Sequence, residues 1–521
     1  MENIYGHADS DARLCRHGAD EYRQREHEPD AEDFVSDPAI IDNLLPQGGW
    51  GGLDRPWMVR TDTEAYEILS EKFYAAQEIV YGDANHYYAV DPFHEGGIRP
   101  SDLTDEVIAQ NVLENLVDRY DEDAVWLIQH WWSNPTDSLL EGLEGYRDDH
   151  AMILNLTSVP DTGDSAGSTG IPDDARFKNT PWVYCMLESY GGNASLDANL
   201  EVLANIPQLV KDKGNTTLQG IGIISEATLD VPAAYDLLWE MAWEDSSIDL
   251  DQWIESYITR RYGTFSDNAY EAWMYLKDSV YSSSRGTLGN LMSQNPDLNL
   301  SLSKVKYSEA DLEKAFLLLM KDYDVLSSSE GYLFDLEEIA SQIIRNNQYS
   351  LLGEVRIAYN DKDLDAFAES KERLLDSFDL LDAIAQMSSS TLLGEWIGKA
   401  KDYAENYDDF SMDMFRINAK AMLTTWKNSV NTGLIDYAAR NYNGLIKDVY
   451  KQVWSQYLDS LEENLRNGTE VEKANKYELY WAWVLDDKEY TRETLSDTVE
   501  IKALMEQVSE EMMSIDQDDL T

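Results

Sequence analysis

The sequence predicts two consecutive architectures: an incomplete (β/α)8-type barrel of the α/β class, and after it an all-α domain. Between residues 34 and 263, short apolar runs alternate with amphipathic helical patterns, as in parallel βα units. All 13 prolines lie at or before Pro296. Beyond that proline, apolar residues recur at spacings of three and four, which is the period of amphipathic helices.

Five short apolar runs are the strand candidates. Runs of this length between turn-forming residues are typical of buried strands rather than of helices. A helix is expected between the first two strands, over residues 101–120 with Ser101 as its cap, and Pro232 suits the first turn of a later helix. The strand candidates are residues 86–90, 124–129, 151–156, 182–187 and 220–224.

An open doubly wound sheet is the alternative to the barrel, because both folds are built from parallel βα units. No glycine-rich phosphate-binding pattern follows any of the five strand candidates, which disfavours a nucleotide-binding fold. In the all-α region, six amphipathic runs predict helices over residues 309–326, 334–359, 363–387, 410–426, 434–465 and 470–484.

The chain therefore divides into three predicted parts. Residues 1–33 have almost no apolar periodicity and are expected to be a disordered extension. They are also expected not to be homologous to the first strands and helices of a barrel. Residues 34–263 are expected to form the C-terminal part of the barrel, and residues 264–521 the all-α domain. On this interpretation the natural N-terminus is truncated, and the first strands of the barrel are missing.

Charge and composition exclude several classes of partner. The 99 acidic and 41 basic residues give a formal net charge of −58, and this field repels nucleic acid and anionic membranes. Acid spread along the whole chain is typical of halophilic proteins. No apolar run reaches the roughly 18 residues of a membrane helix. No signal peptide is found, so a cytoplasmic location is the default expectation, with secretion possible if the N-terminus is truncated.

Polar and aromatic residues follow the predicted strands, and the carboxyl ends of parallel strands are where chemistry takes place in such folds. Two carboxylates flanking a glycosidic bond, with aromatic faces for the sugar ring, would suit a glycosidase. Each residue also has a structural interpretation: Glu226 could face a helix dipole, and Trp131 could pack in the core. The candidates are Asp91, His94, Glu95, Trp131, Glu188, Tyr190 and Glu226.

No cofactor and no metal site is predicted. His7, His17 and His27 lie ten residues apart, and His94 has no second histidine at helical spacing. A serine or cysteine hydrolase is disfavoured, because the sequence has no G-x-S-x-G and Cys185 falls inside a strand candidate.

Nine blocks of the sequence, in order, resemble glycoside hydrolase family 89, the α-N-acetylglucosaminidases. They include HYYAVDPFHEGG (86–97), GIGIISEA (220–227), INAKAMLTTW (417–426) and LIDYAARNYNGLIKDVYKQVW (434–454). The resemblance implies a small N-terminal domain, a (β/α)8-type barrel and an all-α domain. It also implies a retaining exo-hydrolase without a cofactor, whose partner is a carbohydrate with a terminal α-linked N-acetylglucosamine or related amino sugar.

The resemblance also implies residue roles. Glu95 matches the general acid/base, Glu226 the nucleophile, Trp131 a substrate contact and Trp454 a tryptophan that closes the sugar pocket. Retaining geometry would place the two carboxyls roughly 5–6 Å apart.

The chain also departs from the family pattern, and two other interpretations stay open. Glu188 and Ser189 stand where the family usually has His-Asn, which leaves the identity of the sugar open. A barrel without its first strands could be a non-catalytic fragment that binds sugar, or a fragment that needs a complementing N-terminal chain.

Overall fold

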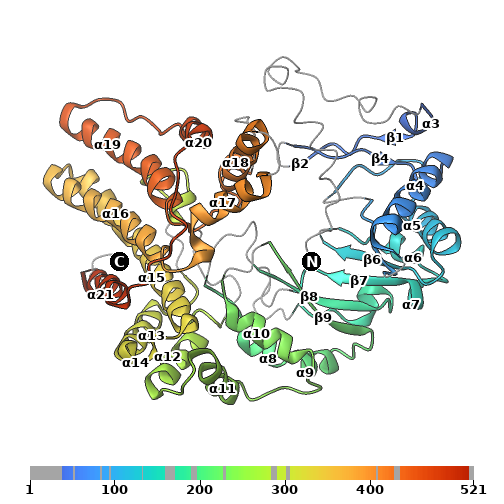
Figure 1. Cartoon of the computed structure of the whole chain (residues 1–521), viewed down its shortest axis with the longest axis horizontal. Coiled ribbons are helices and arrows are strands. Elements are labelled where there is room, and N and C mark those ends of the chain that lie inside the picture. Colours follow the sequence, from blue (N-terminus) through green and yellow to red (C-terminus); the bar gives the residue numbers. More distant parts are fainter. Residues whose placement is uncertain are drawn as a thin grey trace.

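The computed structural model shows a sheet-containing lobe and a helical lobe (Figure 1). It describes residues 38–514 apart from 51–52, 83–84, 93–95, 132, 159–169, 189–195, 227–229, 283–289, 301–304, 406–408 and 427–433. The expected extension over residues 1–33 lies outside the described residues. One continuous hydrophobic cluster runs through both lobes, from Tyr74 to Val508.

The centre of the first lobe is a parallel sheet of five strands in the order β5-β6-β7-β8-β9. Each strand pairs in parallel with the next one along the chain, so the sheet grows in one direction, as in a (β/α)8 barrel, and does not reverse as in a doubly wound sheet. The five predicted strands are therefore confirmed. They are β5 (Tyr87–Ala89), β6 (Val125–His130), β7 (Ala151–Asn155), β8 (Trp182–Glu188) and β9 (Leu218–Ser225).

Helices precede and follow the strands of this sheet, and one of the two predicted helix starts is confirmed. Pro232 begins α10 as predicted. The helix expected from Ser101 starts later, because the hydroxyl of Thr104 accepts the backbone N–H of Val107 and caps α5. The elements are α3 (Pro38–Ile41), α4 (Glu64–Tyr81), α5 (Asp105–Leu113), η2 (Glu114–Tyr120), α6 (Asp137–Glu141), α7 (Arg147–His150), η3 (Asp174–Phe177), α8 (Leu200–Ala204), α9 (Ile206–Asp212) and α10 (Pro232–Met241).

Two small antiparallel pairs precede the parallel sheet and were not predicted. In the first, β1 (Leu44–Leu45) pairs with β4 (Met58–Val59), and in the second, β2 (Gly49–Trp50) pairs with β3 (Leu53–Asp54). Strands of two residues carry no usable period-two pattern, so sequence periodicity does not reveal them.

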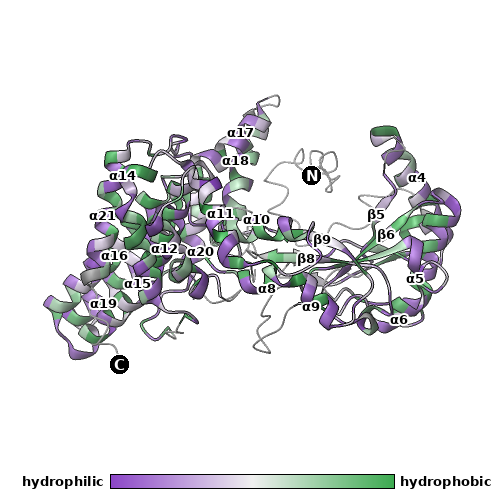
Figure 2. Ribbon diagram, turned by 90° about the horizontal axis from the view of Figure 1, so that it is seen from below, coloured by the Kyte–Doolittle hydropathy of each residue, from purple (hydrophilic) through white to green (hydrophobic). Residues whose placement is uncertain are grey.

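All the regular elements of the second lobe are helices in the part of the chain that the structure describes, as predicted. Its helices carry hydrophobic and hydrophilic residues in alternation along their length (Figure 2). They are α11 (Leu250–Tyr262), α12 (Asp267–Asp278), η5 (Leu291–Ser293), α13 (Glu309–Lys321), α14 (Tyr323–Leu326), α15 (Glu330–Asp361), α16 (Leu364–Ile384), η6 (Ser389–Thr391), α17 (Leu393–Ala404), α18 (Asp409–Leu423), η7 (Ile446–Tyr450), α19 (Lys451–Asn467), α20 (Lys476–Leu485) and α21 (Thr498–Ser514).

One predicted helix is wrong over its first third. The run expected at residues 434–465 is helical only from Ile446, while residues 434–445 form irregular turns. Asp436, Ala439 and Gly444 have φ values of 58°, 33° and 92°, which an α-helix does not allow. The apolar spacing of this segment reflects burial in turns rather than a helix face.

The long helix α15 joins the lobes through polar side chains. Gln342 accepts the N–H of Leu196 at 3.3 Å, and Glu338 accepts the N–H of Val231 at 3.0 Å. Asp335 accepts two N–H groups of Arg261. Because residues 335, 338 and 342 lie one turn apart on one helix face, a single stripe of α15 holds the segments that flank the sheet.

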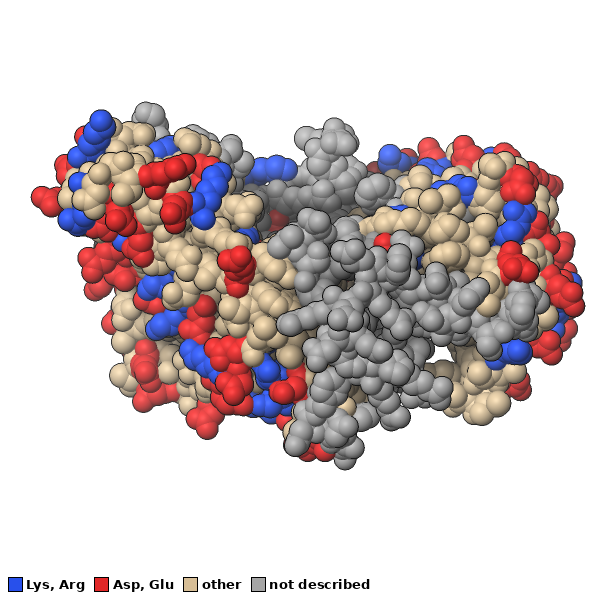
Figure 3. Space-filling model, turned by 90° about the horizontal axis from the view of Figure 1, so that it is seen from above, with Lys and Arg blue, Asp and Glu red and all other residues tan. Residues whose placement is uncertain are grey.

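Acidic side chains are spread over both lobes on the face drawn in Figure 3. Lys and Arg side chains lie between them on the same face, and many form exposed ion pairs, which individually add little stability. Among the residues that the structure describes, no helix is long and apolar enough to cross a bilayer.

The first prediction concerns Glu337 of α15, which is 3% exposed. Burial raises the pKa of its carboxyl from 4.5 to about 8, and the hydrogen bond from the Thr391 hydroxyl opposes this rise. Because the folded pKa exceeds the unfolded one, the stability that the protonated group contributes is complete below about pH 4.5 and is lost as the pH rises to about 8. Between these limits, Glu337→Gln should gain up to about 1.4 kcal/mol of unfolding free energy per pH unit relative to the parent chain.

Denaturant unfolding at pH 5, 6, 7 and 8 measures this difference. Glu372→Gln, which removes an exposed carboxylate of the same lobe, should differ from the parent chain by a constant amount. A difference for Glu337→Gln that does not change with pH would contradict the prediction.

Candidate active site at the carboxyl end of the sheet

Glu226 follows β9 directly and lies exposed at the carboxyl end of the parallel sheet. The hydroxyl of Tyr437 donates to this carboxylate, at 2.9 Å from Oε2 and 3.1 Å from Oε1. Tyr437 is 211 residues further along the chain and belongs to the helical lobe. The two lobes therefore meet at the one carboxylate that sequence analysis singled out as a nucleophile.

The turn that presents Tyr437 is held by a buried charge. Asp436 is 7% exposed and accepts the hydroxyl hydrogen of Tyr480 at 3.0 Å, while Lys476 forms an ion pair with the same carboxylate. Burial raises the pKa of Asp436 to about 6, and Lys476 and Tyr480 oppose the rise. Lys476 and Tyr480 are four residues apart, on one face of α20, so one helix anchors this turn.

Trp426 packs beside Tyr437 from the end of α18. The two rings meet edge to face, with centroids 5.8 Å apart and planes at 71°. Trp426 has a φ of 56°, so the chain is not helical there. The backbone N–H of Asp436 donates to the carbonyl of Thr424 and thereby connects the segment after α18 to the turn that presents Tyr437. Trp426 Nε1 and Thr425 Oγ1 are buried and have no hydrogen-bond partner among the described residues.

The other predicted residues are placed unevenly. Asp91 lies exposed after β5, and Trp131 lies half-buried after β6, so both are at the same end of the sheet as Glu226. Glu188 is the last residue of β8. His94, Glu95 and Tyr190 lie outside the described residues, so the expected separation of the two catalytic carboxyls stays a prediction.

Trp454 is expected to close the sugar pocket from the helical lobe. Its side chain on α19 is fully buried, and its Nε1 donates to the carbonyl of Leu291 at 3.3 Å. The described contacts of Trp454 are thus packing contacts within the helical lobe, and its role at the pocket stays a prediction. The helical lobe reaches Glu226 through the hydroxyl of Tyr437, and Trp426 contacts the Tyr437 ring.

Sequence reasoning missed Tyr437 and Trp426, although both lie in blocks that carry the family resemblance. Residues 417–426 end at Trp426, and residues 434–454 include Tyr437. The predicted helices over 410–426 and 434–465 hid their roles, since an aromatic residue on a helix face is usually a packing residue. Asp436, directly before Tyr437, was an indication of a turn in this segment, because aspartate is a common turn residue.

Two other reactive side chains are occupied or inert. The Nδ1 of His130 lies 2.6 Å from the Asn155 side-chain oxygen, and its Nε2 lies 2.8 Å from Nη2 of Arg176. Burial also lowers the pKa of His130. Burial raises the pKa of the Cys185 thiol to about 12, so it is not a thiolate nucleophile at neutral pH.

Two sequence profiles of one protein family match consecutive parts of the chain. The α-N-acetylglucosaminidase (NAGLU) tim-barrel domain matches residues 36–245, and the NAGLU C-terminal domain matches residues 253–507. The chain belongs to glycoside hydrolase family 89. The incomplete (β/α)8-type barrel followed by an all-α domain is therefore confirmed, while the predicted domain boundaries at 33 and 263 stay predictions.

Relatives of this family 89 chain include the human α-N-acetylglucosaminidase, which is 25% identical over 483 residues, 88% of this chain and 63% of the relative. A family 89 glycoside hydrolase from Clostridium perfringens, solved with 2-acetamido-1,2-dideoxynojirimycin, superposes with a TM-score of 0.83. It is 30% identical, and the match covers 92% of this chain and 55% of that one.

A form of the clostridial enzyme with two glutamates replaced by glutamine was solved in complex with its substrate GlcNAc-α-1,4-galactose. It is 29% identical to this chain, with a TM-score of 0.83, and the match covers 93% of this chain and 56% of that one. The chain thus spans between about half and two thirds of the length of the relatives it matches.

The second prediction concerns the ion pair behind Tyr437. Lys476→Met should destabilise the chain by about 3–5 kcal/mol, because it leaves the buried Asp436 carboxylate without its cation. Combining it with Asp436→Asn should recover part of that loss, because no unpaired charge remains. Denaturant unfolding measures both effects.

Lys473→Met is the matched control, because that lysine is 82% exposed and should contribute no more than about 0.5 kcal/mol. Equal losses for Lys476→Met and Lys473→Met would show that the buried pair does not hold the turn.

Proposed function

We propose that this family 89 chain is a glycoside hydrolase that releases terminal α-linked N-acetylglucosamine. The observation that carries the proposal is the Tyr437–Glu226 contact, because it brings the helical lobe against a carboxylate at the carboxyl end of the sheet. The curated relative is an α-N-acetylglucosaminidase, and the clostridial relative was solved with an N-acetylglucosaminide substrate. These relatives do not favour the alternative of a non-catalytic sugar-binding fragment.

The reaction that suits these residues is a double displacement with retention. Glu226 Oε attacks the anomeric carbon, and Glu95 gives its proton to the leaving oxygen as the C–O bond breaks. Glu95 then takes a proton from water, and the hydroxide oxygen replaces Glu226 on the sugar. The substrate-bound relative with two Glu→Gln replacements supports a role for two glutamates in this family.

Tyr437 has a positioning role in this proposal. Its hydroxyl donates to both oxygens of Glu226, so it selects the rotamer in which the carboxylate faces the site. As negative charge leaves Glu226 during attack, this hydrogen bond weakens, and the hydroxyl becomes available to a hydroxyl or ring oxygen of the sugar.

The polar atoms of the neighbouring segments suit a sugar. Trp426 Nε1 and Thr425 Oγ1 have no partner among the described residues, and buried donors of this kind usually pair with water or ligand. Asp91 and Trp131 stand at the same end of the sheet and complete the proposed pocket with the aromatic pair Trp426 and Tyr437.

The third prediction tests the two glutamates. On a 4-nitrophenyl α-N-acetylglucosaminide, Glu226→Ala should abolish hydrolysis. On a second substrate with a poor leaving group, Glu95→Ala should lower kcat by about 10²–10⁴-fold. Azide should restore turnover in both variants. Glu226→Ala should give the inverted glycosyl azide, because azide attacks the substrate directly, and Glu95→Ala the retained one, because azide attacks the glycosyl-enzyme in place of water.

Proton NMR of the first-formed sugar measures the stereochemistry, and retention is expected for the parent chain. Glu244→Gln, an exposed substitution on the same lobe, should leave the rate unchanged. Release of the inverted sugar, or full activity of Glu226→Ala, would contradict the mechanism.

The fourth prediction separates positioning from binding. Tyr437→Phe keeps the ring contact with Trp426 and removes only the hydroxyl that donates to Glu226. We expect kcat to fall by about ten- to a hundredfold with a smaller change in KM, because misplacing a reacting group costs about this much. Steady-state kinetics measures the split, and an effect on KM alone would assign Tyr437 to substrate binding only.

A further inference from the structure

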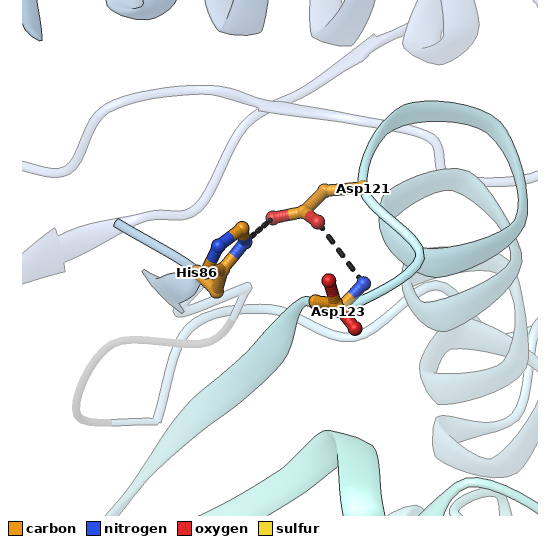
Figure 4. A group of neighbouring side chains, drawn as sticks. All are labelled: His86, Asp121 and Asp123. Atoms are coloured by element: carbon orange, nitrogen blue, oxygen red, sulfur yellow. Dashed lines mark hydrogen bonds and ion pairs between the residues drawn. The ribbon is translucent and has the colours of Figure 1, made fainter. Parts of the chain in front are cut away.

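His86, Asp121 and Asp123 meet at the amino end of the parallel sheet, away from Glu226 at its carboxyl end. His86 immediately precedes β5, and the two aspartates lie in the short connection between η2 and β6 (Figure 4). Because β5 and β6 are neighbours in the sheet, this connection and the start of β5 lie side by side.

The three side chains offer one nitrogen and two oxygen ligand atoms, all within 4.8 Å of one another. The Nδ1 of His86 lies 2.9 Å from Oδ2 of Asp121. The N–H of Asp123 donates to Oδ1 of Asp121 at 3.0 Å, and the hydroxyl of Tyr88 donates to Oδ2 at 2.9 Å. These bonds fix the Asp121 carboxylate, while the Asp123 side chain is exposed.

Charge in this cluster is not balanced by a basic side chain. Among the described residues, the ion pair of Asp121 is with His86, and neither Lys nor Arg pairs with Asp121 or Asp123. The net charge of −58 adds an attractive field for cations.

We propose that His86, Asp121 and Asp123 bind a divalent transition-metal ion of the Zn²⁺ type. One imidazole nitrogen and two carboxylate oxygens are ligands that Zn²⁺ accepts, and water would supply the fourth position. Zn²⁺ bonds of about 2.0–2.2 Å place tetrahedral ligand atoms roughly 3.4 Å apart. The His86–Asp121 pair needs to open by only a few tenths of an ångström, and a rotation of Asp123 brings in the third ligand.

This site would stabilise the sheet rather than take part in hydrolysis. Strand β5 is the end strand of the five, and its register with β6 covers only three residue pairs. A metal held by the start of β5 and the start of β6 cross-links the two strands at this end. The sequence did not predict it, because the histidine and Asp121 are 35 residues apart and match no metal-ligand spacing.

The test uses the full chain after treatment with a chelator, titrated with Zn²⁺ alone by calorimetry and followed by thermal unfolding. Asp123→Asn and His86→Gln should each raise the Zn²⁺ dissociation constant about tenfold or more. Even the loss of a residue that only bonds to a metal ligand lowers metal affinity by about 10–100-fold. Zn²⁺ should raise the Tm of the parent chain more than that of either variant.

Glu122→Gln is the matched control, because it removes the same charge from the exposed residue between the two ligands. It should bind Zn²⁺ as the parent chain does. Equal affinities for Asp123→Asn and Glu122→Gln would overturn the proposal, since binding would then follow surface charge. Binding of Mg²⁺ or Ca²⁺ with the affinity of Zn²⁺, unchanged by His86→Gln, would also overturn the proposal. Such a site would need only the two carboxylates.

Discussion

The buried polar stripe of α15 is the constraint on which the site depends. Glu338 and Gln342 accept the backbone N–H groups of Val231 and Leu196, so the helical lobe docks on the sheet lobe by directional contacts, while Asp335 ties α15 to Arg261 of α11 within the helical lobe. Apolar packing alone would tolerate sliding, whereas buried hydrogen bonds cost free energy if left unmade. This docking sets the distance between Tyr437 and Glu226, which come from different lobes.

A second buried charge shapes the surface that the helical lobe presents. Asp436 holds a left-handed φ of 58° beside Tyr437, a conformation that costs about 1–3 kcal/mol for a residue other than glycine. Its bonds to Lys476 and Tyr480 offset that cost. The all-α domain is thus non-helical at the turn from which Tyr437 contacts Glu226.

The two ends of the sheet have different tasks in the proposed picture. At the carboxyl end, Tyr437 of the helical lobe reaches Glu226 of the sheet lobe from an irregular turn. At the amino end, the bond between His86 and Asp121 connects the start of β5, the end strand of the five, to the segment before β6. An acidic chain gains from a cation at such an edge, because the ion removes local repulsion while it cross-links β5 and β6.

The sequence by itself determined the order of strands and helices, the all-α second half and Glu226 at a strand end, because periodicity and strand-end position are local properties. It also carried the family resemblance that marked Glu95 and Glu226. Only the tertiary structure decided that Trp454 is buried, that residues 434–445 are not helical, and that Tyr437 reaches Glu226. These features depend on contacts between distant residues, such as Asp436 with Tyr480, Trp454 with Leu291 and Tyr437 with Glu226, and no local pattern encodes such contacts.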